Sequence, residues 1–424
     1  MARRAEPSPR LGWPRPRASI VPNQCLNWDA RMNTFKLVLL AVVVFGTRST
    51  LLAYQDGEAD NGVNVPLPLL VRKIIVAEQA TSFSIGESTE NEIVLAAYGN
   101  DGLLRVAVKK QERSGGKIFK SEIEFVDPPR ILVADLDGDS KAEILVCGEK
   151  LRVYRIQKDE LSLAWTSQET FDHVPAPRLG VSDFDGDGHT DIAVLNYMPE
   201  KTSKTKSLYL YVNLQMDSQF LLSGTATLTD EHGFHSLSGL AIGDFSGDER
   251  DDIVVGNSNG WMWLLEVNNE EPTVVKSWEV ESGGAIGPGL SAGNMVAGGK
   301  KELLVGTNGG DIHVYRFPVN GDPKVIATAT TLGRFAYGVQ AGDMDGDGVD
   351  EFLLTRGSKA DRMTEIWKIN GDSLFSVWRK EATEFEYPRL MLRDFDGDGK
   401  PEMVTYSLSN RGRKIEAIKP VLAR

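Results

Sequence analysis

The amino-acid sequence predicts an all-β protein, a seven-bladed β-propeller built from repeats of about 50 residues. Three observations predict this fold. A phrase made of an apolar run, a carboxylate-rich loop and a second apolar run recurs along the chain. Two more strand-like stretches follow each phrase, such as LRVYRI and LSLAW, and they are rich in β-branched and aromatic residues. Helical periodicity is absent from these stretches.

The N-terminal region stands apart from the repeats. Residues 1–31 hold six arginines and five prolines, which predicts a disordered segment or a mis-annotated extension. Residues 32–53 have the layout of a secretory signal peptide, with Lys36 before an apolar run from Leu37 to Gly46. A buried core helix is the alternative. Because the run is about half the ~20 residues that span a bilayer, we expect export and no stable membrane span.

Composition excludes several classes of protein. The 424 residues are 41% hydrophobic and 25% charged, which excludes disorder throughout. A net charge of −13 argues against a nucleic-acid binder. Cys25 and Cys147 are the only cysteines, so a disulfide-built fold and a cysteine zinc site are excluded. Beyond residue 53 the net charge is −19, an excess that the acidic loops must explain.

The repeated phrase defines seven units between residues 65 and 424. Clear copies include VADLDGDSKAEILV, VSDFDGDGHTDIAV and AGDMDGDGVDEFLL. The acid that begins the second apolar run marks the units, at Glu92, Glu143, Asp191, Asp252, Glu302, Glu351 and Glu402, with spacings of 48 to 61 residues. An open β-solenoid would need a much shorter period. The last unit stops short of a full blade and LLVRKIIVA (69–77) has no blade of its own, so an N-terminal strand is expected to complete the last blade.

Small residues precede most of the loops. Ala134, Ser182, Gly243, Gly293 and Gly342 stand immediately before a loop, and Arg393 is the exception. Small side chains are expected where the innermost strands of a propeller crowd together near its axis.

Five of the loops carry acidic or hydroxyl side chains at relative positions 1, 3, 5 and 9. The sets are Asp135, Asp137, Asp139, Glu143; Asp183, Asp185, Asp187, Asp191; Asp244, Ser246, Asp248, Asp252; Asp343, Asp345, Asp347, Glu351; and Asp394, Asp396, Asp398, Glu402. Carboxylates this close repel one another by several kcal/mol per pair at an effective dielectric of ~20. Oxygen-only ligands in a glycine-containing loop favour Ca²⁺ over Mg²⁺. The spacing therefore predicts about five calcium sites, and the units of Glu92 and Glu302, with no acid at positions 3 and 5, are predicted to be empty.

Two alternatives to these calcium loops remain. Asp and Gly are also frequent in ordinary hairpin turns, although five copies in register favour a shared ligand. An EF-hand or dockerin would need flanking helices and an acid at position 12, whereas strands follow here at position 10.

With these loops in view, the region from about residue 65 to 424 resembles FG-GAP or VCBS repeat proteins and is similar in scaffold to the seven-bladed propeller of integrin α subunits. The resemblance implies a calcium-binding propeller that serves in binding or adhesion. Within this region the literal Phe-Gly and Gly-Ala-Pro signatures are missing, with VVGN and LVGT the nearest sequences, so integrin pairing and ligand specificity do not transfer.

Candidate ligand-binding residues lie at the other end of the predicted strands. Arg130, Arg178 and Arg389 each stand five residues before a loop, with aromatic residues nearby that include Phe171, Tyr337 and Tyr387. Such a set suits an acidic carbohydrate or an extracellular protein partner. The alternative is that the arginines pair with neighbouring carboxylates and the aromatic rings fill the spaces between blades.

Enzyme motifs are weak. Residues 256–260 match G-x-S-x-G, but the strand-turn-helix context of a nucleophile elbow is missing. The favoured function is therefore a secreted, monomeric, non-catalytic binding scaffold. A propeller-type carbohydrate-active enzyme, such as a polysaccharide lyase, is the alternative, although no residue stands out as its base.

Overall fold

The structure is a computed structural model. It describes residues 62–65, 82–88, 92–99, 101–110, 116–125, 129–171, 177–196, 205–213, 219–229, 237–280, 286–298, 300–319, 321–331, 337–357, 362–381, 389–394, 398–409, 412–420 and 422. These residues all belong to the second of two compact units, Leu52–Arg424. The predicted extension 1–31, the signal peptide 32–53 and the stretch 69–77 lie outside the described residues.

Every described element is a β-strand, which confirms the all-β class. Four sheets each contain four antiparallel strands in chain order. They are β2 (Ser82–Ser88), β3 (Glu92–Tyr98), β4 (Leu103–Lys110) and β5 (Gly116–Glu124); β6 (Arg130–Ala134), β7 (Glu143–Cys147), β8 (Leu151–Gln157) and β9 (Glu160–Thr166); β10 (Arg178–Ser182), β11 (Asp191–Asn196), β12 (Thr205–Asn213) and β13 (Phe220–Thr229); and β14 (Leu237–Gly243), β15 (Asp252–Asn257), β16 (Trp261–Asn268) and β17 (Glu271–Glu279).

A fifth four-stranded sheet joins the two ends of the repeat region. It contains β26 (Arg389–Arg393), β27 (Glu402–Ser409), β28 (Gly412–Pro420) and the N-terminal β1 (Gly62–Val65). Strand β1 pairs antiparallel with β28, and Gly62 lies across from Pro420. A strand from the start of the repeat region thus covers the outer edge of the last sheet.

Seven blades would appear as seven four-stranded sheets, whereas the described residues form six sheets, because two of the expected units share one eight-stranded sheet. One half contains β18 (Ile286–Gly293), β19 (Glu302–Thr307), β20 (Asp311–Arg316) and β21 (Lys324–Thr330); the other contains β22 (Tyr337–Gly342), β23 (Glu351–Arg356), β24 (Met363–Asn370) and β25 (Ser373–Glu381). A single bridged pair, Thr328 with Ser373, joins the halves through their outermost strands. Outer strands of neighbouring units approach closely enough here to form one ladder contact.

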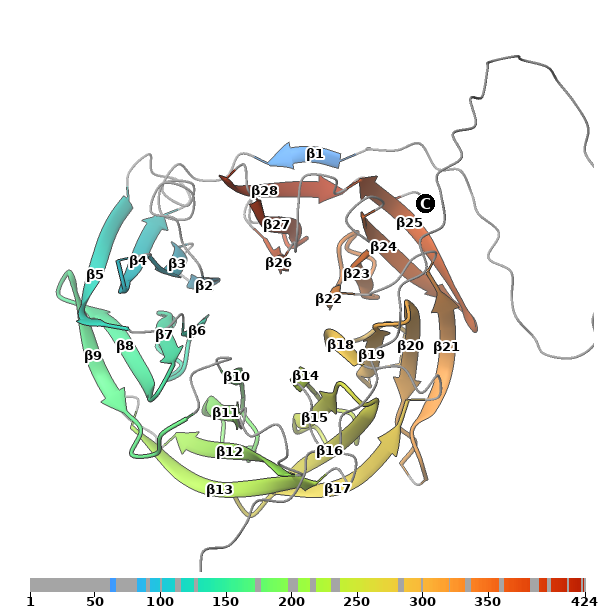
Figure 1. Cartoon of the computed structure of the whole chain (residues 1–424), viewed down its shortest axis with the longest axis horizontal. Coiled ribbons are helices and arrows are strands. Elements are labelled where there is room, and N and C mark those ends of the chain that lie inside the picture. The colour runs from blue at the N-terminus through green and yellow to red at the C-terminus, as the bar shows by residue number, and fades with distance from the viewer. Residues whose placement is uncertain are drawn as a thin grey trace, which may run out of the picture. The chain divides into compact units, whose positions relative to one another are not determined.

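The sheets have a propeller-like arrangement (Figure 1). The first strand of each four-strand unit lies innermost and contacts the first strand of the next, in the order β2, β6, β10, β14, β18, β22 and β26. Arg393 in β26 donates from Nε to the main-chain oxygen of Ile85 in β2, at 2.7 Å. This hydrogen bond connects the last inner strand to the first one.

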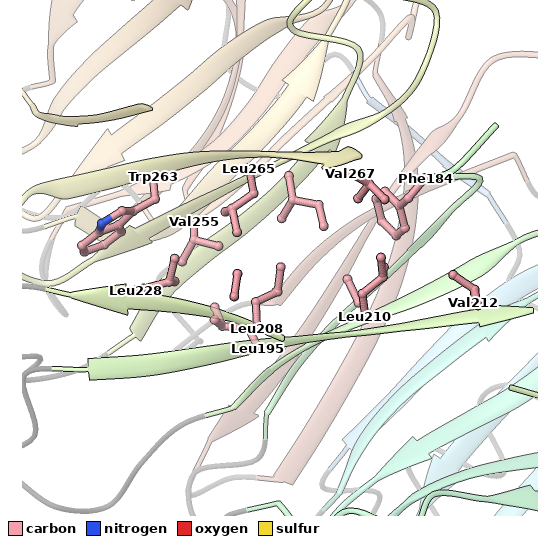
Figure 2. Packing of buried hydrophobic residues seen from close by; sticks show 13 residues of the cluster. Phe184, Leu195, Leu208, Leu210, Val212, Leu228, Val255, Trp263, Leu265 and Val267 are labelled. Atoms are coloured by element: carbon pink, nitrogen blue, oxygen red, sulfur yellow. The ribbon is translucent and has the colours of Figure 1, made fainter. Parts of the chain in front are cut away.

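The hydrophobic core lies between neighbouring sheets. The second strands are the most buried elements, and β11, β15, β19 and β23 are buried at every residue. Figure 2 shows one cluster, in which Leu195 and Leu208 of one sheet lie close to Val255 and Leu265 of the next. Strands buried on both faces need continuous apolar runs, which explains the second apolar run of the repeated phrase.

The structure explains why small residues precede the loops: neighbouring inner strands lie close together there, as expected from the sequence. A Cβ atom built on Gly293 would lie 2.5 Å from the Cβ of Ala341 on the next inner strand, and one on Gly243 would lie 2.9 Å from the Cβ of Ala292. Contacts this short do not occur between real Cβ atoms. Close approach of the inner strands therefore requires glycine at these positions.

Candidate functional site

Each carboxylate loop joins the first strand of a sheet to the second, and its first acid folds it. Asp135 follows β6 and accepts hydrogen bonds from the backbone N–H groups of Gly138 (2.8 Å) and Ser140 (2.9 Å). Asp183 accepts the same pair of bonds from Gly186 (2.8 Å) and Gly188 (2.9 Å). Aspartate side chains stabilise turns in this way without any ligand, so these bonds explain the loop shape and leave its other acids available.

Position 6 of the loop has a positive φ in all five copies. The φ values are 87° at Gly188, 86° at Gly348 and 82° at Gly399, and 72° and 71° where Ser140 and Glu249 replace glycine. The left-handed backbone turns the loop tightly, which glycine adopts most readily. The tight curl expected from the glycine pattern is thus shared by the two loops that lack this glycine.

The acid at position 9 begins the second strand and is buried. In the four loops whose position 2 is described, this acid accepts a hydrogen bond from the backbone N–H of that residue, for example from Leu136 to Glu143 (2.9 Å) and from Phe184 to Asp191 (3.1 Å). The side chains at position 2 of these four loops are also buried. Sequence reasoning missed this apolar position, although an apolar residue recurs there between two acids.

Four of the five predicted sites bring carboxylates together. Groups with one oxygen each within 4.8 Å of the others are Asp135, Asp137 and Glu143; Asp183, Asp185 and Asp191; Asp343, Asp345 and Asp347; and Asp394, Asp398 and Glu402. Asp139, Asp187 and Glu351 belong to predicted sets but stand outside these groups. Asp396 lies outside the described residues.

The third predicted site is different. Among its fully described residues, Asp244, Asp248 and Asp252 form no such three-carboxylate group. Arg250, at position 7, directs its guanidinium to Asp248, with Nη2 2.6 Å from Oδ2. The arginine neutralises Asp248 at the rim of the loop, while Asp252 is buried at its base.

Burial changes the ionisation of the position-9 acids. It raises the pKa of Glu143, Asp191 and Asp252 each to about 7, because a buried carboxylate loses the water that stabilises its charge. Neighbouring acids add to the effect, since Asp185 faces Asp191 and raises its pKa further. A cation among these oxygens would offset both causes and keep the acids ionised.

Basic side chains that the sequence analysis missed enter three of the loops. Arg155 contacts Asp137 and Glu143, Lys368 contacts Asp345, Asp347 and Glu351, and Lys419 contacts Asp398 and Glu402. All three come from the third strand of their sheet, as does Arg316, which binds Glu302 at 2.7 Å in a loop predicted to be empty. Nothing in the loop sequences indicates these partners.

Four of the five candidate ligand-binding residues lie at the opposite end of the inner strands. Arg130, Arg178, Tyr337 and Arg389 each begin an inner strand, whereas the carboxylate loops follow the ends of these strands. Arg130 donates from Nε to the carbonyl oxygen of Pro177 in the next unit, at 3.4 Å. Tyr387 and the side chains of Tyr337 and Arg389 lie outside the described residues.

Phe171, one of the aromatic residues near these arginines in the sequence, has a structural role. Its side chain is 3% exposed and packs edge-on against Tyr209, with the ring centroids 5.3 Å apart. Phe171 therefore fills the space between two sheets, as the alternative interpretation of these aromatics expects.

Comparison with known proteins supports the repeat and the fold. A family model described as an FG-GAP-like repeat matches residues 183–255, which confirms the resemblance over this part of the chain. BBSome complex member BBS7 of Mus musculus is 28% identical over 110 residues. This match covers 26% of the present chain and spans 15% of BBS7.

Solved structures with a similar fold share little sequence with the chain. BBS1N in complex with ARL6DN gives a TM-score of 0.51 at 12% identity, covering 80% of this chain and 91% of that one. Raptor of Chaetomium thermophilum gives 0.50 at 12% identity, covering 81% and 28%. The mitotic checkpoint complex gives 0.50 at 10% identity, covering 92% and 99%. At such identities the likeness shows the fold alone.

No helix among the described residues has the length and apolar character needed to cross a membrane.

Proposed function

We propose that this protein is an exported, calcium-binding β-propeller that serves as a non-catalytic binding scaffold. One observation carries the proposal. The same carboxylate loop recurs at the same position of successive sheets, and four copies bring three carboxylate oxygens within 4.8 Å of one another. Hairpin turns alone do not require acids at positions 3 and 9, because the acid at position 1 already folds the loop.

The donor chemistry fits calcium. Carboxylate oxygens are hard ligands, and a loop that also presents main-chain oxygens can reach the six to eight ligands that Ca²⁺ takes. In the second loop the side chains of Asp183, Asp185 and Asp191 would hold the ion. Bound calcium would neutralise these acids and fix the loop against the buried base formed by Asp191.

Seven blades follow if the eight-stranded sheet counts as two. Its halves are each a complete set of four antiparallel strands, and one residue pair, Thr328 with Ser373, joins them. Seven marker acids in the sequence support the same count.

Removal of calcium tests the central part of the proposal. At a free calcium concentration of about 100 times the Kd of a loop, calcium bound in that loop should stabilise the fold by about 2.7 kcal/mol. We expect excess chelator to lower the melting temperature by several degrees and calcium, but not magnesium, to restore it. Differential scanning calorimetry measures the shift and elemental analysis counts the ions. An unchanged melting temperature together with no retained calcium would contradict the proposal.

The ligand-binding end is proposed to be the one that carries Arg130, Arg178, Arg389, Tyr337 and Tyr387. Guanidinium groups and aromatic rings suit an acidic carbohydrate or an acidic protein surface. In a screen of acidic glycans and polyanions, the wild type should show saturable binding, and replacing the three arginines with alanine should abolish it. Neither the wild type nor this variant should form an unsaturated product. Unchanged binding would remove this part of the proposal, and turnover would favour the lyase alternative.

Export depends on residues 32–53. If they direct secretion, the intact mass of protein recovered outside the cytosol should correspond to a chain that begins near residue 54. Recovery of the uncleaved chain in the cytosol would contradict export.

A further inference from the structure

One residue of each third strand lies level with the marker acid of the second strand. In the first sheet Lys110 pairs directly with Glu92. In the other six, the register of the second and third strands, extended by one residue, places Arg155, Val212, Glu266, Arg316, Lys368 and Lys419 across from the marker acids, in chain order. Five of these seven residues are lysine or arginine. The two exceptions face Asp191 and Asp252, which begin β11 and β15.

Lys368 shows what the cationic residues do. Its Nζ atom lies 2.6 Å from Oδ2 of Asp345, 2.8 Å from Oε1 of Glu351 and 3.2 Å from Oδ2 of Asp347. The lysine side chain is only 21% exposed. An ammonium group thus stands among the side-chain oxygens that would otherwise bind a metal ion. Three acids of one loop share a single positive charge that the chain itself supplies.

Arg155 and Lys419 repeat this arrangement. Arg155 pairs with Asp137 and its Nε lies 3.5 Å from Oε1 of Glu143. Lys419 pairs with Asp398, and its Nζ lies 3.6 Å from Oε1 of Glu402. Position on the third strand, and not the loop sequence, is what these residues have in common.

The loop from Asp183 to Asp191 differs, because the residue across from Asp191 is Val212. The bonds recorded to its acids come from backbone N–H groups, including those of Phe184 and Asn213 to Asp191. Among the described residues no lysine or arginine forms an ion pair with them. Within the described part of the chain, this loop therefore gathers three carboxylates with no ion-paired lysine or arginine.

We propose that Lys368 is a tethered cation that occupies the loop from Asp343 to Glu351 in place of a metal ion. More generally, the residue across from the marker acid decides which loops take up calcium. The inference rests on the proposed function and divides its loops into two classes. Calcium and an ammonium group repel each other and compete for the same oxygens, so an ion must displace Lys368 to bind. The loop from Asp183 to Asp191 then binds calcium most tightly.

Replacing Lys368 tests the proposal directly. Lys368→Met should bind one more calcium ion per chain than the wild type and melt at a lower temperature in chelator, because three acids lose their counter-ion. Calcium should restore its melting temperature. Lys368→Arg keeps the charge and should behave like the wild type. Lys117→Met removes an exposed ion pair with Asp159 outside the loops and serves as the matched control. Titration calorimetry counts the ions and scanning calorimetry gives the melting temperatures.

The outcomes separate this inference from the proposed function. If Lys368→Met keeps both the calcium count and the melting temperature of the wild type, the tethered cation is refuted, even if five ions bind. If the wild type binds no calcium but Lys368→Met binds one ion, the tethered cation stands and the calcium-loaded scaffold fails. Asp185→Asn should remove one ion from the wild type, and an unchanged count would overturn the assignment of the tightest loop.

Discussion

Glu249 occupies a backbone position that suits glycine better. Its φ of 71° places it in the left-handed region, like Gly188 at the same position of the preceding loop. Residues with a Cβ atom pay about 1 kcal/mol or more for this conformation. The fold tolerates the cost because both neighbouring strands hold the loop in place.

Glu249→Gly should therefore stabilise the protein. We expect a gain of about 0.5–1 kcal/mol and a rise in melting temperature of about 1–2 °C, measured in chelator so that metal binding does not contribute. Gly188→Ala is the opposite change at the equivalent residue and should lower the melting temperature. Equal effects of the two substitutions would show that backbone conformation does not determine residue choice here.

Single residues were predictable where the signal is local. The acids at positions 1 and 9 follow from a fixed spacing within one loop, and the structure gathers most of them. Lys368 and Arg155 were not predictable, because they come from the third strand. The connection between second and third strands varies in length, from the gap between Ser409 and Gly412 to that between Asn196 and Thr205. Register across such a connection cannot be counted from the sequence.

At the scale of elements, the inner strands show how close packing selects sequence. Gly293 ends β18, and the β22 residue Ala341 lies directly against it. Side chains at this contact have no room to rotate away, because the inner strand of the following unit lies on that side. The predicted rule of small residues before the loops was correct for this physical reason.

Gly293→Val tests the rule. Overpacking the contact with Ala341 should cost about 2–3 kcal/mol, because one inner strand must move. The midpoint of urea unfolding should fall accordingly. Gly309→Ala is a control in an open turn, where the nearest atom to an added Cβ lies 3.5 Å away. A midpoint for Gly293→Val as high as that of the control would show that the inner strands are loosely packed.

For the molecule as a whole, the repeat period predicted the arrangement of sheets but not how they connect. Four strands per unit follow from length and turn residues, and the structure has them. The eight-stranded sheet was not predictable, because it depends on one contact between outer strands, Thr328 with Ser373. The contacts between distant units also explain Arg393, the one large residue among the small residues that precede the loops. It reaches Ile85 in the first unit, a partner 308 residues earlier in the chain.

Pairing of β1 with β28 imposes an order on synthesis. The ribosome makes β1 first and its partner last, and at about 5–20 residues per second the wait is on the order of tens of seconds. During that time the nascent chain is an open arc with a free edge at each end. The pairing of β1 with β28 can form only after β28 has left the ribosome, so the ring closes late in folding.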